Sequence, residues 1–140
     1  MKVSVKAVKI HDGLSEETMC FEATLYIDGK KAASASNRGQ GGCNEYHFID
    51  AKVEKAFYSW TEKQEMEFDF EKEDQIVSKL VIAFDEDRWC KRKSKTKTLF
   101  RLKGDAADGW RTLSAPYCDR VKAFMDKKYG DTITTIYGVC

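Results

Sequence analysis

The sequence predicts one domain of the α+β class, with a curled, mostly antiparallel sheet and about three helices packed on one face. Apolar and polar residues alternate in three strands of the first 36 residues, apolar residues recur at helical spacing later, and the last third reads strand, helix, strand. The 140 residues match the length of a single domain, and no linker rich in Ser, Gly or Pro interrupts them. We therefore assign residues 1–140 to one domain.

The first three strands are the best-marked elements. Residues 2–10 alternate, but the apolar parity changes between Ala7 and Val8, which predicts a bulge. A second alternating strand follows, and Asp28-Gly29 then supplies the positive φ angles of a tight hairpin. The return strand, residues 30–36, is rich in Ala and Ser, so we expect a helix to lie close to its backbone.

Apolar residues at helical spacing predict three helices. The first covers about 49–60, with Asp50 placed to cap its free amides. The second covers about 74–90, and its acidic start and basic end suit the helix dipole. The third begins near Pro116 and ends at Gly130.

Three further segments alternate or are β-branched. Residues 98–102 and 132–137 are predicted strands that flank the third helix. Between the first two helices, Met66, Phe68 and Phe70 alternate with acids, which fits either a short strand or an extended connector. The sheet is thus expected to combine three N-terminal strands with a C-terminal β-α-β segment.

Charge is balanced overall but segregated along the chain. The 24 basic and 23 acidic side chains exclude a dedicated polyanion binder, and the 42% of hydrophobic residues exclude a disordered tail. Residues 65–87 hold nine acids and two lysines, whereas residues 91–103 hold seven basic residues and no acid. The acidic run suits a basic protein surface of the kind that grips nucleic acid, although simple solubility explains it too. Nucleic acid itself is not an expected partner, because the acids would repel it.

No apolar run is long enough to cross a membrane, and the first residues carry no secretory segment, so we expect a cytoplasmic protein without membrane contact. Five cysteines are present, in odd number and without a C-x-x-C pair, which predicts reduced thiols. They are Cys20, Cys43, Cys90, Cys118 and Cys140, of which Cys140 is expected to be exposed.

The segment Asn37-Arg38-Gly39-Gln40-Gly41-Gly42-Cys43-Asn44 is the strongest functional signal. Glycine-rich backbone is able to present several amide hydrogens to one anion, and Arg38 adds a planar fork for phosphate or carboxylate. A solvated loop without function is the alternative, and both stay open. The candidate ligand- or partner-binding residues are Asn37, Arg38, Gly39, Gln40, Gly41, Gly42, Asn44, Tyr46 and His47 and, as an exposed anchor in a later polar loop, Trp110.

Metal and catalytic signals are weak. Cys43-x-x-x-His47 resembles half of a zinc site, but no second close pair accompanies it, so we expect no metal and no cofactor. His11 and His47 are the only histidines, and no G-x-S-x-G or H-E-x-x-H motif occurs. We therefore favour a protein that is not an enzyme.

Three stretches together resemble a group of small uncharacterised proteins of tailed bacteriophages and related mobile elements. They are Ser15-Glu16-Glu17-Thr18-Met19-Cys20-Phe21, Tyr26-Ile27-Asp28-Gly29-Lys30-Lys31 and the glycine-rich segment, with a weaker likeness at Tyr129-Gly130-Asp131. No activity or catalytic residue is established for that group. The resemblance implies an accessory protein that acts in a bacterial cytoplasm.

Our leading hypothesis is a non-catalytic protein that inhibits a host defence or regulatory factor by surface contact. One alternative is a sponge that sequesters a nucleotide-like anionic small molecule through the glycine-rich segment. Another is a small enzyme centred on Cys43 and His47. An inhibitor of this kind predicts a sizeable patch of acids and aromatics with no deep pocket, whereas a sponge predicts a concave site, for example at a subunit junction.

Overall fold

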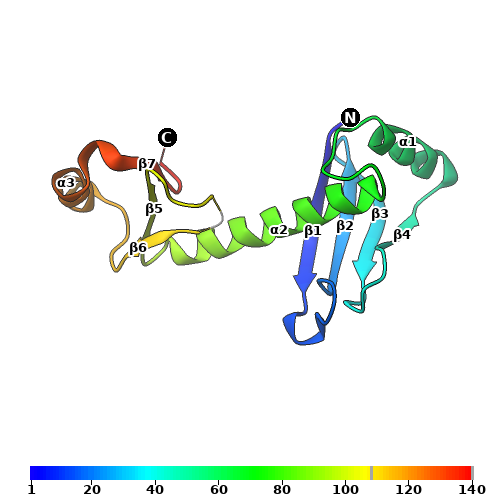
Figure 1. The fold of residues 1–140 in the computed structure, drawn as a ribbon, viewed down its shortest axis with the longest axis horizontal. Helices are drawn as coiled ribbons and strands as arrows, with labels where there is room; N and C mark the ends of the chain where they lie inside the picture. The colour runs from blue at the N-terminus through cyan, green and yellow to red at the C-terminus, as the bar shows by residue number, and fades with distance from the viewer. Residues whose placement is uncertain (108, 140) are drawn as a thin grey trace. The chain divides into compact units, whose positions relative to one another are not determined.

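The computed structural model describes residues 1–107 and 109–139 (Figure 1). Over these residues the chain has three α-helices and two antiparallel sheets, which confirms the α+β class. It forms two compact units, Met1–Asp85 and Glu86–Cys140, and each is described by itself below. Cys140 lies outside the described residues, and the single domain stays a prediction.

The expected single sheet is wrong, because the strands form one sheet of four and another of three. The N-terminal sheet has the order β1-β2-β3-β4. Its strands are β1 (Val3–Ile10), β2 (Phe21–Ile27), β3 (Lys30–Asn37) and β4 (Glu45–Phe48). The short β4 was not predicted; it pairs along β3, with Ala35 opposite Tyr46 and Ser34 opposite His47.

The predicted bulge and hairpin are both confirmed. The register between β1 and β2 shifts between Lys6 and Lys9, and Ala7 has a φ of 52°. Asp28 and Gly29 have φ angles of 51° and 82°, which give the turn the twist that an antiparallel pair requires.

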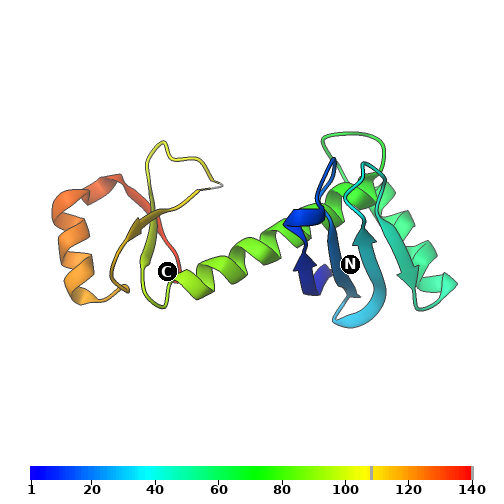
Figure 2. The same cartoon turned by 90° about the horizontal axis from the view of Figure 1, so that it is seen from below.

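Two helices cover one face of this sheet. Helix α1 (Ala51–Glu62) begins after Asp50, whose side chain accepts a hydrogen bond of 2.8 Å from the Val53 amide, as predicted. Helix α2 (Lys72–Lys93) is longer than expected at both ends. Figures 1 and 2 show its first part crossing the sheet. The shared core includes Phe21, Leu25, Ala33, Ala35, Phe57, Val77 and Val81, so the small residues of β3 do lie against helices.

The C-terminal unit has its own sheet, in the order β6-β5-β7. It contains β5 (Thr98–Leu102), β6 (Arg111–Leu113), α3 (Asp119–Lys128) and β7 (Ile133–Ile136). The short β6 was not predicted. Because β6 and β7 occupy both edges of β5, this sheet is complete within the last third of the chain. Short 3-10 helices cover Asp12–Leu14 and Gly130–Thr132.

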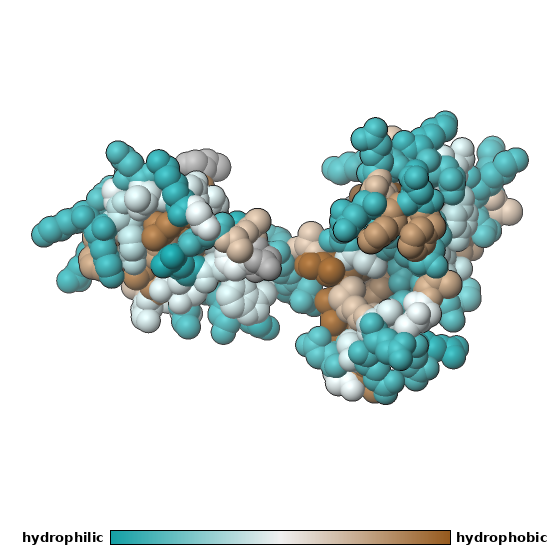
Figure 3. Space-filling view, viewed as in Figure 1, coloured by the Kyte–Doolittle hydropathy of each residue, from teal (hydrophilic) through white to brown (hydrophobic). Residues whose placement is uncertain are grey.

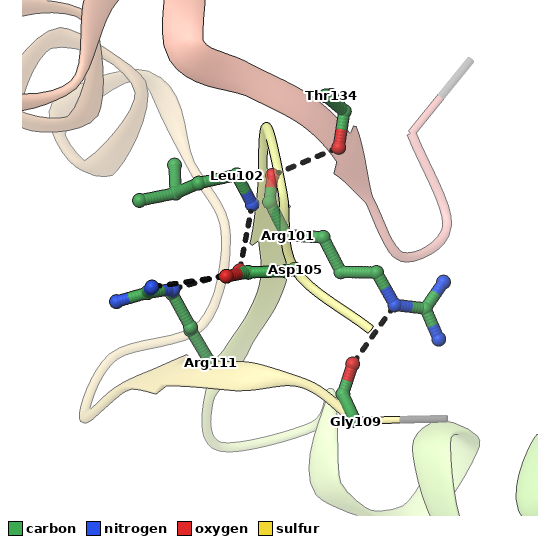
Figure 4. Close-up of polar contacts among 6 residues, drawn as sticks. All are labelled: Arg101, Leu102, Asp105, Gly109, Arg111 and Thr134. Atoms are coloured by element: carbon green, nitrogen blue, oxygen red, sulfur yellow. Dashed lines mark hydrogen bonds and ion pairs between the residues drawn. The ribbon is translucent and has the colours of Figure 1, made fainter. Parts of the chain in front are cut away.

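Asp105 ties the loop after β5 to β6 (Figure 4). Its carboxylate accepts hydrogen bonds from the Leu102 amide and from two guanidinium nitrogens of Arg111, at 2.9, 2.7 and 3.0 Å. Beside it, Arg101 donates from Nε to the Gly109 carbonyl oxygen, and Thr134 donates to the Arg101 carbonyl oxygen. The bonds with Arg111 and Leu102 lower the pKa of Asp105 from 3.8 to about 2.

This low pKa predicts a difference in acid sensitivity between the wild type and Asp105→Asn. A carboxyl group with a lowered folded-state pKa stabilises the fold above its ordinary pKa of 3.8 and loses that contribution as the pH falls towards 2. The Tm advantage of the wild type should therefore be largest above pH 4 and shrink towards pH 2. Thermal unfolding followed by circular dichroism across this range measures it. A constant difference between the two proteins would contradict the prediction.

None of the helices in the described part of the chain is both long and apolar enough to span a bilayer.

Candidate functional site

The glycine-rich loop between β3 and β4 has a defined shape, because it packs against the segment before β2. The carbonyl oxygen of Gly39 accepts hydrogen bonds from the amides of Glu16, Glu17 and Thr18, at 2.9, 3.0 and 3.4 Å. Gly39 is buried, has a φ of +82°, and lies so close to the Leu14 carbonyl oxygen that a Cβ atom would overlap it. Glycine is therefore required here for a close backbone approach.

Asn37 holds the two ends of the loop together. Its Oδ1 accepts hydrogen bonds from Thr18 Oγ1 at 2.7 Å and from the Gly39 amide at 2.8 Å. Its Nδ2 donates to the Gly42 carbonyl oxygen and to Asn44 Oδ1, both at 3.0 Å. These four bonds use the full capacity of the side-chain amide, which is 7% exposed. Asn37 therefore shapes the loop and does not present its side chain to a ligand.

Two of the glycine amides also have partners within the chain. The Gly39 amide donates to Asn37, and the Gly41 amide donates to Thr18 Oγ1 at 3.3 Å. A Cβ atom on Gly41, whose φ is +89°, would overlap the Glu17 carboxylate. These two amides are thus not directed at a free anion.

Tyr46 and Asp74 join the loop to the first turn of α2. Tyr46 donates its hydroxyl hydrogen to Asp74 Oδ1 at 2.6 Å, and Asn44 donates to Tyr46 Oη at 3.1 Å and, through its backbone amide, to Asp74 Oδ2 at 3.0 Å. Burial, together with the bond to Asp74, raises the pKa of Tyr46 well above its ordinary value. Its ring packs against Phe48 and Phe57, so it does not offer a face to a stacked base.

His47 follows Tyr46 on β4, and successive side chains of a strand point to opposite faces. It is exposed opposite Ser34, on the side of the sheet away from Tyr46 and Asp74. Cys43 is an exposed free thiol, and among the described residues no hydrogen bond joins it to His47. Nor do the described residues contain a group of three or more His, Cys, Asp and Glu side chains that is able to hold a metal ion.

The loop residues that do face solvent include Arg38 and Gln40. With Gly42, Cys43 and Glu45 they line a small hollow of about 240 Å³. Arg38, Gln40 and Gly42 are therefore predicted site residues that are open to a ligand or partner.

Trp110 is not the exposed anchor that we expected. It is half-buried in the C-terminal unit, where the Arg101 guanidinium lies 3.6 Å from its ring centroid and Tyr137 meets it edge-on. Its Nε1 is buried without a hydrogen-bond partner among the described residues. Its polar neighbours in the sequence suggested exposure, but Arg101 from β5 and Tyr137, which follows β7, pack against its ring.

A larger cavity of about 440 Å³ shares Asn37, Gly42 and Cys43 with the hollow of about 240 Å³, and the sequence did not predict where it lies. The loop, the start of β2, the beginning of α2 and the connector before α2 form its walls. The connector holds Phe68 and Phe70, which are 50% and 64% exposed with ring centroids 5.5 Å apart. No strand forms there, so the connector was the correct alternative.

Gln75 fixes this connector against α2. Its side-chain amide donates to the carbonyl oxygens of Phe68 and Phe70, at 3.0 and 2.9 Å, and accepts from the Phe68 amide at 3.3 Å. The alternation of acids and phenylalanines was the only sequence signal for this wall. The alternation does not reveal that Gln75 binds the backbone of this connector.

Comparisons of the chain with protein-family models, with curated proteins and with solved structures found no match.

Proposed function

We propose that this chain is a small non-catalytic binding protein that acts by surface contact with a protein partner. In the bacteriophage setting that the sequence resemblance implies, the partner is a host defence or regulatory factor, which the contact inhibits in the bacterial cytoplasm. The observation that carries the proposal is the pair Phe68 and Phe70, exposed side by side in an acidic connector next to the firmly held glycine-rich loop.

Exposed aromatic pairs are unusual on a protein that meets only water. Large aromatic side chains contribute strongly to protein interfaces, and apolar patches rimmed by polar residues mark such surfaces. Figure 3 shows apolar side chains surrounded by hydrophilic ones on the face of the N-terminal unit where α2 begins. Gln75 holds the backbone at Phe68 and Phe70, so the connector loses little backbone conformational entropy when a partner covers the two rings.

The charge around these rings indicates which surface would approach them. Residues 65–74 contain six acids and one lysine. Such a segment attracts a basic surface over distances of about one Debye length and repels nucleic acid. A basic protein surface, of the kind that binds nucleic acid, is therefore the partner that fits best.

The two alternatives have less support. Sequestration of an anion requires free amides, but those of Gly39 and Gly41 have partners inside the chain, and the larger cavity contains Glu71 and Asp74. An enzyme centred on Cys43 and His47 requires the two to meet, and no hydrogen bond joins them among the described residues.

Affinity purification from a host lysate tests the proposal. We expect the wild type to retain a specific protein, which mass spectrometry identifies. The double substitution Phe68→Ala with Phe70→Ala should weaken binding of this purified partner at least about tenfold, because removing two interface aromatics often costs more than 1.4 kcal/mol. Phe124→Ala is the matched control, because Phe124 is a phenylalanine of similar exposure, 49%, in the other unit. Equal binding by all three proteins would refute the proposal, and a retained nucleotide would favour the sponge.

A further inference from the structure

We infer that the cavity between the glycine-rich loop and α2 receives an arginine side chain from a basic segment of the partner. Glu71 and Asp74 face the positive charge of its guanidinium group, and Phe68 and Phe70 face the plane of that group. This inference rests on the proposed function and specifies the chemistry of its partner.

The cavity has the size and lining of a binding site. Its volume of about 440 Å³ falls within the range of about 300–1,000 Å³ that is usual for ligand pockets. Met19, Phe21, Phe68 and Phe70 give it an apolar lining. Polar atoms come from Thr18, Asn44, Gln75 and Ser78 at other points of the wall. An aliphatic stem with a polar head fits such a mixture.

The charge of the cavity is of one sign. Glu71 and Asp74 are among its lining residues, and no lysine, arginine or histidine is. Within residues 1–107 and 109–139, the Asp74 carboxylate accepts hydrogen bonds from two neutral groups, the Tyr46 hydroxyl and the Asn44 amide. Among the described residues, neither carboxylate takes part in an ion pair. A cation from outside the chain would therefore meet two carboxylates that no internal cation neutralises.

The two rings select arginine over other cations. A guanidinium group is planar, stacks on aromatic faces and is weakly hydrated, whereas an ammonium group is a compact and strongly hydrated charge. Phe68 and Phe70 lie at the mouth of the cavity, half or more exposed. An arginine that enters between the two rings and the carboxylates of Glu71 and Asp74 would stack on the rings and pair with the carboxylates at once.

The acids beyond the cavity indicate a peptide segment, not a free amine. Glu65, Glu67 and Asp69 are exposed on the same connector and do not line the cavity. A single small cation in the cavity would not pair with these three carboxylates, whereas basic residues that flank the arginine in a protein segment would lie near them.

Fluorescence anisotropy with a labelled hexa-arginine peptide tests this on the full chain. Hexa-citrulline is the neutral peptide of the same shape, and we expect it to bind at least about tenfold more weakly. Glu71→Gln and Phe70→Leu should each weaken hexa-arginine binding about three- to tenfold, because the first removes one charge and the second removes one cation–π contact. Glu54→Gln, the same change at an exposed site on α1, should change it less than about twofold.

Three results would overturn the inference. The first is equal affinity for hexa-citrulline and hexa-arginine. The second is a loss of binding in Glu54→Gln as large as that in Glu71→Gln. The third is binding of N-acetylarginine amide alone as tight as that of the peptide. The second result would mean diffuse charge attraction, and the third would mean a small-amine site. Each of them leaves the lysate experiment with Phe68 and Phe70 unaffected, so failure here is distinguishable from failure of the proposed function.

Discussion

Gly39→Ala is expected to destabilise the N-terminal unit by about 3 kcal/mol or more. An L-residue at the φ of +82° costs about 1–2 kcal/mol relative to glycine. The added Cβ would also overlap the Leu14 carbonyl oxygen and press on the Cys20 Cβ at 2.9 Å, and neither belongs to a flexible side-chain end that moves away easily. The loop would have to separate from the segment before β2 and lose the three amide bonds to the Gly39 carbonyl oxygen. Urea unfolding followed by circular dichroism measures the change.

Substitutions at two other glycines separate the backbone cost of a positive φ from the cost of the steric overlap. Gly29→Ala has the same φ of +82° but open space around the new Cβ, so it should show the backbone cost alone, about 1 kcal/mol. Gly42→Ala has open space and no positive φ, so it should change stability by less than about 0.5 kcal/mol. If Gly39→Ala behaved like Gly29→Ala, the close packing of the loop against residues 14–20 would be refuted.

Elements that depend on local chemistry were predictable from the sequence. The Asp28-Gly29 turn requires positive φ angles, which glycine adopts freely, and the Asp50 cap requires a short acceptor beside free amides. Helix α2 carries a long amphipathic pattern with acids at its start and bases at its end. Each of these signals lies within a few residues of the structure that it specifies.

Strand pairing was not predictable in the same way. Short strands such as β4 and β6 carry too few residues for a pattern, and their existence depends on the partner strand. The expectation of one sheet was wrong for this reason, because no local sequence pattern indicates that β5 pairs with β6 and β7 only.

The candidate site also depends on contacts between distant parts of the chain, which the sequence does not reveal. The sequence directed attention to the glycine-rich segment, and the structure gives that segment a defined shape. Yet Gly39 and Gly41 serve close packing against residues 14–20, a role that composition does not distinguish from an anion nest. The acid-lined cavity was missed because its walls come from four separate parts of the chain. Gln75, which holds the backbone of the connector, looks like any polar helix residue in the sequence.

Asn37→Ala is expected to lower the stability of the N-terminal unit by about 2–4 kcal/mol, because it removes four hydrogen bonds and leaves buried groups without partners. The buried Gly39 amide is the most affected, since water reaches it least. Ser36→Ala, one position earlier on β3, is the control and should change stability by less than about 0.5 kcal/mol. A similar loss of stability in both variants would show that any alanine substitution at the end of β3 destabilises the unit, and that the bonds of Asn37 within the loop are not the cause.

Asn37 and Gly39 act on the same loop, so their effects should not add. Once Gly39→Ala has separated the loop from residues 14–20, the Asn37 side chain no longer has its full set of partners to lose. The double variant should therefore be less destabilised than the sum of the single variants, with an interaction energy of about 1 kcal/mol or more in a double-mutant cycle. Strict additivity would mean that the two residues stabilise separate parts of the unit, and the loop would then not be one rigid element of the binding surface.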